Sequence, residues 1–404
     1  MSDKFRVLVC GGGNGAHVMA GLAAAKPDIE ARVLTLFADE ADRWSESLKT
    51  NDLTILVKGS DGQPDTAIKA KPSIVSKKPE EVVPGCKMII FVVPAFAHNQ
   101  YLDAIKPYVD PKCIILGVPG PSFDYAVRGI LGDKSDNVLI FETLPWACRI
   151  KEYGKEVEIL GSKETILGAI QGSLSTAPIG PMGKTPVETL QYILGAAPVL
   201  HVTGHPLGIT LMAAHTIHCA IMYGTWANWD GKPLDKVPLF YQGVDEATAQ
   251  LMSDLSNENL TVTEGIKRKR PDVDLSQVKH VYDWFMTRYT NDVQDKSSLK
   301  TVLQTNNAYA GLKHNMLEIE PGKFVPDFTH RYLSENVPFG LAVTRGVAEV
   351  AGIETPIMDK ILLWAQEKLG KEFLVNGKMQ GKDIQYTRCP QAYGLTTLDD
   401  ILGH

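Results

Sequence analysis

The first forty residues alternate apolar runs with one glycine-rich segment. Phe5–Cys10 is short, apolar and rich in valine, as expected of a strand buried on both faces. After the glycines, His17–Ala25 contains good helix formers and stops at Pro27, because proline cannot continue a helix. A second apolar run follows at Ala31–Phe37. The pattern therefore predicts a strand, a glycine turn, a helix and a second strand.

The spacing of small residues in this turn suggests a nucleotide site. Gly11, Gly13 and Ala16 occupy the positions of the G-x-G-x-x-G/A pattern, whose third position accepts alanine because it serves close packing of helix on strand. Between a strand and a helix, such a turn presents backbone N–H groups to a pyrophosphate. We therefore take Gly11, Gly13, Asn14, Gly15 and Ala16 as candidate cofactor-binding residues. The alternative is an ordinary glycine turn between buried elements.

Two charged residues after the second strand bear on the choice of cofactor. Asp39 stands roughly where dinucleotide folds place an acid on the adenosine ribose, which favours NAD over NADP. Arg43 follows closely, and an arginine there can accommodate the extra phosphate of NADP. We expect NAD, with both residues as cofactor contacts.

Further apolar runs extend the alternation of strands and helices. Leu53–Lys58 and Ala67–Lys71 flank a turn at Gly59–Gly62 and predict a hairpin. Buried strands are expected at Lys87–Val93, Cys113–Gly117 and Val138–Phe141, followed by loops in VPAFAH, VPGPS and ETLPWACR. The carboxyl ends of parallel strands open on one crevice, so these loops should converge there. Pro94 and Ala95, in the first loop, are further candidate cofactor contacts.

The pattern changes near residue 205. Before it the alternation is that of a doubly wound α/β sheet, and after it helical periodicity dominates. Pro206–Trp229 is apolar almost all round, which predicts one central buried helix. We expect a nucleotide-binding domain over residues 1–205 and an all-α domain over residues 206–404.

Composition narrows the class of protein. The 404 residues carry a formal net charge of −6, which gives no reason to expect a nucleic acid partner. Neither a signal peptide nor an apolar run of the ~18 residues of a membrane span is present, so we expect a cytoplasmic protein without a membrane partner. The six cysteines include no C-x-x-C pair and no metal-ligand spacing, which favours reduced thiols and no bound metal.

Two histidines on the predicted buried helix are candidates for chemistry. His215 and His218 lie three residues apart and so point to similar sides of the helix. Each is either a satisfied core residue or an acid–base catalyst that could face a nicotinamide. A zinc site lacks a third ligand at sensible spacing.

A second cluster lies in Pro326–Gly340, with the sequence PDFTHRYLSENVPFG. It reads as a proline-bounded loop that is either functional or a solvated connection. Arg331 stands out, because its guanidinium can bind a phosphate or a carboxylate through two hydrogen bonds.

Together these motifs resemble a known family. The segments VCGGGNGAH, LTLFADEADRW, VPAFAH, FETLPWACRIKE, WANWDGKP, PLFYQG, RYLSENVPFG and WAQEKLGKEFLVNGK through TRCPQAYG are similar to the octopine dehydrogenase group of opine dehydrogenases. The resemblance implies a Rossmann domain followed by an all-helical domain, with the substrate site in the cleft between them. It implies NADH-dependent, reversible condensation of pyruvate with the amino group of an amino acid, which maintains NAD for glycolysis, and a monomeric enzyme.

The resemblance also implies roles for individual residues. His218, in HCAIMYGTW, matches the catalytic histidine of the family, whereas His215 falls where the family need not have one. Cys148 and Trp284 match positions that line the amino-acid side of the cleft, so with His218 they are expected to bind substrate. Arg331 matches an arginine that reaches the pyrophosphate of the cofactor.

The chain departs from the family pattern at one position. Where the family has Glu-Asp before the isoleucine or valine and the proline, this chain has Glu335-Asn336. The expected carboxylate partner of His218 is therefore an amide, which can orient the ring but supplies no charge. Either Glu335 turns inward to substitute for it, or His218 works with Asn336 and a lower pKa.

The substrate and two other functions stay open at this point. Gly117–Ser122 carries no carboxylate to pair with a guanidinium, which favours an amino acid smaller than arginine, such as alanine, glycine, β-alanine or taurine. The same cofactor turn would serve a hydroxy-acid dehydrogenase with a helical second domain, or a non-catalytic NAD-binding regulator, because one fold hosts many functions.

Overall fold

The chain folds into two units. The computed structural model describes residues 4–59, 64–212 and 214–403. Its contacts group Met1–Ile209 with Gly403 in a first unit and Thr210–Leu402 in a second. The division falls inside the short helix α7 (Pro206–Thr210), just after the boundary that the sequence predicts.

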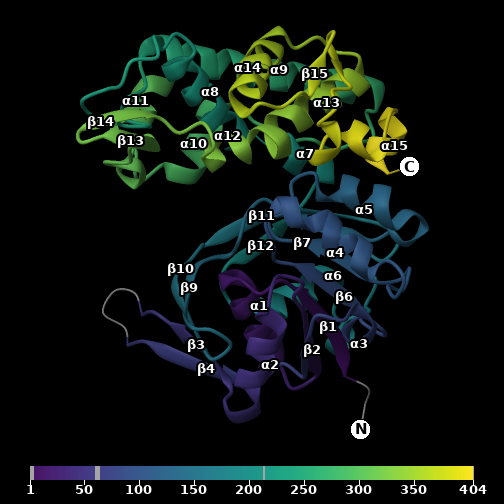
Figure 1. Ribbon diagram of the computed structural model, residues 1–404. Helices are drawn as coiled ribbons and strands as arrows, with labels where there is room; N and C mark the ends of the chain where they lie inside the picture. The colour runs from purple at the N-terminus through teal and green to yellow at the C-terminus, as the bar shows by residue number, and fades with distance from the viewer. Residues whose placement is uncertain (1–3, 60–63, 213, 404) are drawn as a thin grey trace. The chain divides into compact units, whose positions relative to one another are not determined.

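An eight-stranded sheet organises the first unit (Figure 1), in the order β12-β11-β8-β7-β6-β1-β2-β5. Its strands are β1 (Phe5–Cys10), β2 (Ile29–Leu34), β5 (Ile74–Ser76), β6 (Met88–Phe91), β7 (Ile114–Gly117), β8 (Val138–Phe141), β11 (Thr165–Gln171) and β12 (Val199–Val202). The pairings from β8 to β5 are parallel, and β11 joins β8 in the antiparallel sense. Strands β6, β7 and β8 are buried along their whole length, as their unbroken apolar runs predict.

Helices connect the strands and pack beside the sheet. They are α1 (Asn14–Ala24), α2 (Glu40–Thr50), α3 (Pro79–Val82), α4 (His98–Ile105), α5 (Phe123–Leu131) and α6 (Pro186–Leu194). Helix α1 contacts α6, and α4 contacts α5, so the crossover helices form two groups. Strand order, parallel pairing and crossover helices confirm the predicted doubly wound sheet.

A second sheet of the first unit has the order β4-β3-β10-β9. It comprises β3 (Leu53–Val57), β4 (Thr66–Ala70), β9 (Trp146–Glu152) and β10 (Glu156–Ser162). The antiparallel pairing of β3 with β4 confirms the predicted hairpin, and residues 60–63 of its turn lie outside the described part of the chain. The expected loop ETLPWACR is wrong in its second half, because Trp146–Glu152 pairs with β10 as a strand.

The second unit is mainly helical. Its helices are α8 (Ala214–Trp226), α9 (Glu246–Lys269), α10 (Val281–Tyr289), α11 (Leu299–Gln304), α12 (Arg331–Ser334), α13 (Ala342–Ala351), α14 (Pro356–Leu369) and α15 (Leu398–Leu402), with a π-helix at Val337–Leu341. Two short hairpins, β13 (Met316–Glu320) with β14 (Lys323–Pro326) and β15 (Leu374–Val375) with β16 (Lys378–Met379), interrupt the helices. The domain is therefore helical in architecture but not free of strands.

Two predictions for this unit need correction. The single helix expected over Pro206–Trp229 is two helices, α7 and α8, and the carbonyl of Leu211, between them, accepts a hydrogen bond from the side-chain amide of Asn259 at 2.5 Å. The loop expected over Pro326–Gly340 contains α12 and most of the π-helix, which fixes its side chains on helical turns.

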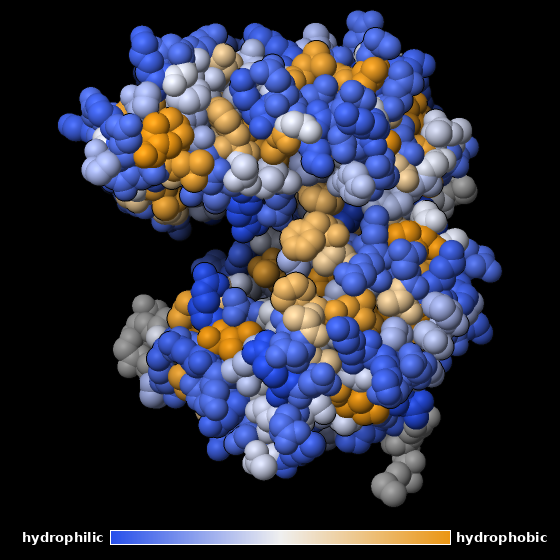
Figure 2. All heavy atoms as spheres, viewed as in Figure 1, coloured by the Kyte–Doolittle hydropathy of each residue, from blue (hydrophilic) through white to orange (hydrophobic). Residues whose placement is uncertain are grey.

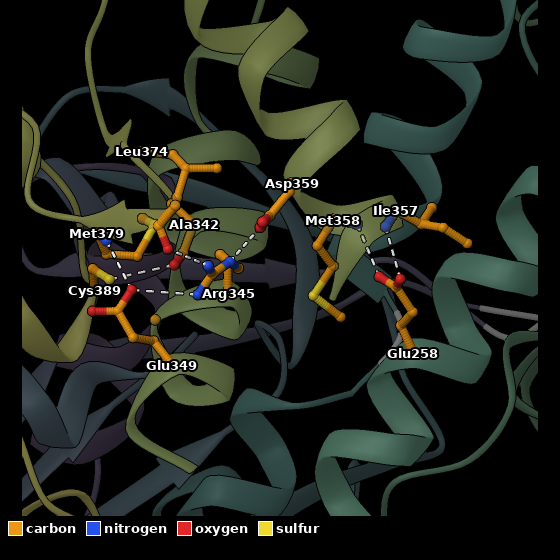
Figure 3. A network of polar contacts seen from close by, with 12 residues as sticks. Glu258, Ala342, Arg345, Glu349, Ile357, Met358, Asp359, Leu374, Met379 and Cys389 are labelled. Carbon is orange, nitrogen blue, oxygen red and sulfur yellow. Dashed lines mark hydrogen bonds and ion pairs between the residues drawn. The ribbon is translucent and has the colours of Figure 1, made fainter. Parts of the chain in front are cut away.

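A network of ion pairs and hydrogen bonds around the buried Arg345 and the partly buried Glu258 links α9, α13 and α14 (Figure 3). Arg345 pairs with Asp359 and Glu349 and donates to the carbonyl of Gly377 at 2.8 Å. Glu258 of α9 accepts the first backbone N–H groups of α14, from Ile357 at 2.7 Å and from Met358 at 2.9 Å. A carboxylate at a helix N-terminus satisfies free donors and interacts well with the helix dipole, so α9 and α14 are locked together.

Polar and apolar residues are unevenly distributed on the surface. Figure 2 shows hydrophilic residues over most of the face in view and apolar residues in smaller separate groups. Within the described residues, no helix combines the length and apolar character needed to cross a membrane.

Candidate active site

The glycine turn of the first unit has the geometry that a dinucleotide needs. Gly11 has φ +129°, and a Cβ there would lie 2.6 Å from the carbonyl oxygen of Val92. The turn therefore packs against the segment after β6, and only glycine fits. A Cβ at Gly13 would meet no atom within 4 Å, so this glycine faces open space.

The start of α1 fits the diphosphate of a dinucleotide. Gly13 is the N-cap residue, no side chain caps the helix, and its first turn carries no acidic residue. Free backbone N–H groups and the positive end of the helix dipole attract an anion. Open space at Gly13 leaves room for a phosphate to approach the backbone, and Ala16 is fully buried, as the packing position of the pattern requires.

A buried histidine fixes this turn. The Nδ1 atom of His17 lies 3.1 Å from the carbonyl oxygen of Gly13, and Nε2 accepts the backbone N–H of Gly154 at 3.1 Å. The ring also stacks on Trp44, with centroids 3.7 Å apart. Burial lowers the pKa of His17 to about 4, so the ring is neutral and acts as a bridge from the turn to the β9–β10 connection.

The other candidate cofactor-binding residues near the glycine turn are Asn14, Gly15, Pro94 and Ala95. The side chain of Asn14 accepts the backbone N–H of Ile150 at 2.9 Å, which ties α1 to β9. Pro94 and Ala95 lie just beyond β6, the strand next to β1, so their loop adjoins the glycine turn. Gly15 would bring a Cβ to 3.0 Å from Val92, which again places the turn beside this loop.

Asp39 and Arg43 form an exposed ion pair at the start of α2, with Arg43 Nε 3.0 Å from Asp39 Oδ1.

A different carboxylate, that of Glu40, lies beside Gly12. Glu40 accepts a hydrogen bond from the hydroxyl of Thr35 at 2.5 Å, and a Cβ at Gly12 would lie 2.0 Å from Glu40 Oε2. A side chain at position 12, which the glycine pattern leaves unassigned, would therefore displace the Glu40 carboxylate from the Thr35 hydroxyl.

His218 is the centre of the second unit's polar site. It lies on α8, partly buried, with its ring stacked on Tyr332 at a centroid distance of 4.2 Å. Its Nδ1 lies 3.3 Å from Asn336 Oδ1, and its Nε2 lies 2.9 Å from the hydroxyl of Tyr241. The side-chain nitrogen of Asn336 donates to the carbonyl of Arg331 at 3.0 Å, so the amide oxygen faces the imidazole. His218 consequently carries its proton on Nδ1 and accepts at Nε2.

The electrostatics keep His218 neutral. Burial is the main cause that lowers the pKa of His218 to about 4, and the charges of Arg331 and His330 lower it further. The hydrogen bond with Asn336 raises the pKa only in part. At neutral pH this imidazole is uncharged and free to accept a proton, and little of its protonated form is present to donate one.

The contacts show which of the two neighbours, Glu335 or Asn336, lies against His218. Glu335 forms an i,i+4 ion pair with Arg331 at 3.0 Å, whereas Asn336 contacts His218. The Arg331 side chain is 68% exposed, so its guanidinium is accessible to an anion. The side chain of His215 lies outside the part of the chain that the structure describes.

Trp284 belongs to the same aromatic cluster as His218. Its ring contacts Tyr289 at 6.0 Å, Tyr289 contacts Tyr309 at 5.2 Å, and Tyr309 stacks on Tyr241 at 3.9 Å. The indole N–H of Trp284 is buried and has no hydrogen-bond partner among the described residues. The sequence did not single out Tyr241, Tyr309 or Tyr332, although PLFYQG and RYLSENVPFG contain two of them.

Cys148 lies on β9 of the first unit, 4% exposed, and burial raises the pKa of its thiol. All six cysteines are buried and free, as the sequence predicts. Cys148 is thus a neutral side chain, suited to packing or weak hydrogen bonding.

Comparisons with known proteins give the family. A family model described as "NAD/NADP octopine/nopaline dehydrogenase, alpha-helical domain" matches residues 202–369. Tauropine dehydrogenase of Arabella iricolor is 48% identical over 400 residues, which cover 98% of this chain and 99% of that protein. The chain belongs to the octopine dehydrogenase family.

Solved structures agree with this assignment. Octopine dehydrogenase with NADH and L-arginine matches with a TM-score of 0.91 and 45% identity, over 99% of this chain and 98% of that one. The same enzyme with NADH and pyruvate matches with a TM-score of 0.88 and 44% identity, over the same shares.

Membership of the octopine dehydrogenase family confirms several predictions. The enzyme is an NAD-dependent oxidoreductase that acts on CH–NH bonds, and its Rossmann domain followed by a helical domain is the family fold. Opine dehydrogenase activity is therefore supported over a hydroxy-acid dehydrogenase or a non-catalytic regulator. The roles of individual residues stay predictions.

Proposed function

We propose that this opine dehydrogenase condenses pyruvate with the amino group of an amino acid smaller than arginine, and that His218 is its acid–base catalyst. The observation that carries the proposal is the oriented, neutral imidazole of His218 on α8, in a chain that belongs to the octopine dehydrogenase family. The solved relatives with NADH and pyruvate, and with NADH and L-arginine, support the class of reactants.

His218 is suited to removing a proton. In the opine-oxidising direction the secondary amine loses its N–H proton as the C–H hydride leaves, and neutral imidazole accepts that proton. In the condensing direction the imidazolium returns a proton, while the neutral amine attacks the ketone and water is lost to give the imine that is reduced. NAD(H) supplies the hydride chemistry, and the protein supplies orientation and proton transfer.

The cofactor contacts follow from the first unit and from Arg331. Gly11, Gly13 and the start of α1 would hold the diphosphate, with Asn14, Gly15 and Ala16 shaping the turn. The loop of Pro94 and Ala95 adjoins that turn, and Asp39 with Arg43 would meet the adenosine ribose. Arg331 would bind the diphosphate by exchanging its ion pair with Glu335 for a phosphate.

The chemistry of Cys148 and of Trp284, each taken in its own unit, favours a small amino acid. Cys148 is a buried thiol whose pKa burial raises, so it offers no charge to a guanidinium. Trp284 holds a buried indole N–H without a partner among the described residues, which suits an acceptor such as a carboxylate or sulfonate oxygen. The similarity to a tauropine dehydrogenase agrees with a small substrate.

A spectrophotometric screen tests the proposal. NADH and pyruvate are incubated with arginine, alanine, glycine, β-alanine or taurine in turn, and loss of NADH absorbance is followed with and without each amine. We expect the fastest amine-dependent loss with one of the small amines. Equal or faster turnover with arginine would overturn the preference, and amine-independent loss would overturn the reaction.

Substitution of the histidine tests its role. His218→Ala is expected to keep NADH binding within about twofold and to lower kcat by about a hundredfold or more, as general acid–base catalysts do. Unchanged turnover would remove His218 from the mechanism.

We also expect a monomer in the cytoplasm. Light scattering of the purified protein tests the oligomeric state, and cell fractionation tests the location.

A further inference from the structure

Tyr241 has a place beside His218 that the family roles above leave unassigned. Its hydroxyl lies 2.9 Å from His218 Nε2, the acceptor nitrogen of the ring. Burial is the main cause that raises the pKa of Tyr241, so the phenol keeps its proton and donates it to Nε2. Among the described contacts, both imidazole nitrogens are thus occupied, Nδ1 by Asn336 and Nε2 by Tyr241.

This double occupation limits how a proton reaches the imidazole. Asn336 presents an amide oxygen, which accepts a hydrogen bond but neither gains nor loses a proton near neutral pH. A phenol has one O–H and free lone pairs, so it can take one proton while it gives another. Tyr241 is therefore the partner of His218 that can pass a proton on.

Tyr241 is also held too firmly to swing aside. Its side chain is 6% exposed, and its ring stacks on Tyr309 with centroids 3.9 Å apart and planes 12° apart. The flanking backbone is fixed, because Phe240 donates its N–H to Leu312 at 2.8 Å and the side chain of Gln242 accepts the N–H of Gly311 at 2.8 Å. A Cβ at Gly243 would lie 2.1 Å from the carbonyl of Leu239, so the turn after Tyr241 is equally tight.

We propose that Tyr241 relays the proton between the reacting amine and His218. In the opine-oxidising direction the amine N–H bond and the Tyr241 O–H bond break, while a new O–H bond on Tyr241 and an Nε2–H bond on His218 form. Tyr241 is neutral before and after, His218 becomes imidazolium, and the hydride leaves with its electron pair as in the proposed function, on which this step rests. The reverse transfer protonates the intermediate during condensation.

Tyr241→Phe tests the relay, because it keeps the stacked ring and removes the hydroxyl alone. We expect kcat in both directions to fall by about a hundredfold or more, the range of general acid–base catalysis, while KM for pyruvate and the Kd of NADH stay within about twofold. Tyr223→Phe is the matched control, since Tyr223 is a tyrosine of α8, the helix that carries His218, and packs on Trp364, 5.4 Å away, with no contact with His218 among the described residues.

A graded replacement separates a relay from a structural role. Fluorotyrosines of increasing acidity at position 241 retain the ring and the hydroxyl but change the ease of proton transfer. A relay predicts that kcat and its solvent isotope effect vary with phenol acidity. Invariant values across the series, or Tyr241→Phe turnover within about threefold of the native enzyme, would overturn the relay, because acid–base groups contribute far more than that.

Two further measurements keep this test separate from the proposed function. If His218→Ala collapses turnover but Tyr241→Phe does not, the relay is wrong and the proposed function stands. If His218→Ala is active, both fail. Nitrogen NMR of labelled histidine in the cofactor-free protein reports the Tyr241–His218 bond without any turnover. We expect the His218 Nε2 resonance to move in Tyr241→Phe and not in Tyr223→Phe, and an unmoved resonance overturns the relay.

Discussion

Asn336→Asp introduces the carboxylate that the resemblance to the family implies beside His218, the proposed catalyst. The new charge would lie near His218 Nδ1, which is 3.3 Å from the present amide oxygen. Two unit charges at about 4 Å interact by about 4 kcal/mol at an effective dielectric constant of about 20. At about 1.4 kcal/mol per pKa unit, this corresponds to an upward shift in the pKa of His218 of about 3 units.

Two features of the site reduce that shift. Asn336 now donates to the carbonyl of Arg331 at 3.0 Å, and an aspartate would place an oxygen against that carbonyl instead. The carboxylate also loses hydration beside a partly buried ring. Arg331 and His330, whose charges lower the pKa of His218, remain in place. We therefore expect a net rise of about 1 to 2 units, from about 4 to about 5 or 6.

The pH dependence follows with a definite sign. In the proposed mechanism opine oxidation needs neutral His218, so the acidic limb of that reaction should move to higher pH by the same 1 to 2 units, roughly, in Asn336→Asp. Condensation needs imidazolium, of which His218 has about one part in a thousand at pH 7 with a pKa of about 4. The variant should therefore extend condensation to more alkaline pH.

The assay is kcat/KM for opine oxidation across pH, together with an NMR titration of the His218 ring. Asn336→Leu is the matched control, because it removes the hydrogen bond that raises the pKa of His218 without adding charge, and it should move the limb in the opposite direction. A pKa in Asn336→Asp that equals or falls below the native value would refute the electrostatic reasoning.

Three further predictions concern the first unit. Gly12→Ala should lower NADH affinity at least about tenfold, because its Cβ would lie 2.0 Å from a carboxylate oxygen of the free protein. Gly13→Ala should also weaken NADH binding, but only because the new methyl group meets the bound ligand, so the Tm of the free protein should stay within about 2 °C of the native value. Calorimetry measures the Tm of both variants, and equal losses of Tm would contradict this distinction. Asp39→Asn should raise the ratio of NADPH to NADH kcat/KM about tenfold, because Arg43 loses its ion-pair partner at 3.0 Å, and an unchanged ratio would exclude the pair from cofactor choice. His17 has a pKa of about 4 in the folded state against about 6.5 unfolded, so its contribution to the free energy of unfolding is complete above pH 6.5, and about 3 kcal/mol of that free energy is lost as the pH falls to 4. Denaturant unfolding across this pH range should show a smaller loss in His17→Gln.

The sequence alone determined the local parts of this protein. The alternation of apolar runs and helix formers predicted β1, the glycine turn, β6 and β8, because burial of a strand on both faces demands an unbroken apolar run. The glycine spacing predicted the turn, since φ +129° at Gly11 suits only a residue without a side chain, and Gly13 leaves open space beside the start of α1. The motifs also predicted the family correctly, because they recur along most of the chain.

What the sequence missed depends on contacts between distant residues. Periodicity could not show that the Asn259 amide would bind the carbonyl of Leu211 between α7 and α8, or that Trp146–Glu152 would pair with β10. Nor could spacing choose between Glu335 and Asn336, which are neighbours in sequence.

The surroundings of His218 were decided only by the tertiary structure. Arg331 draws Glu335 away at 3.0 Å, and the chain returns Tyr241 from the turn before α9 to within 2.9 Å of His218. A hydrogen bond depends on distance and direction in space, whereas the hydrophobic pattern records only which residues leave water. The pattern could therefore locate the helix that carries His218. Only the folded chain brings together the groups that determine the pKa of its ring and which ring nitrogen carries the proton.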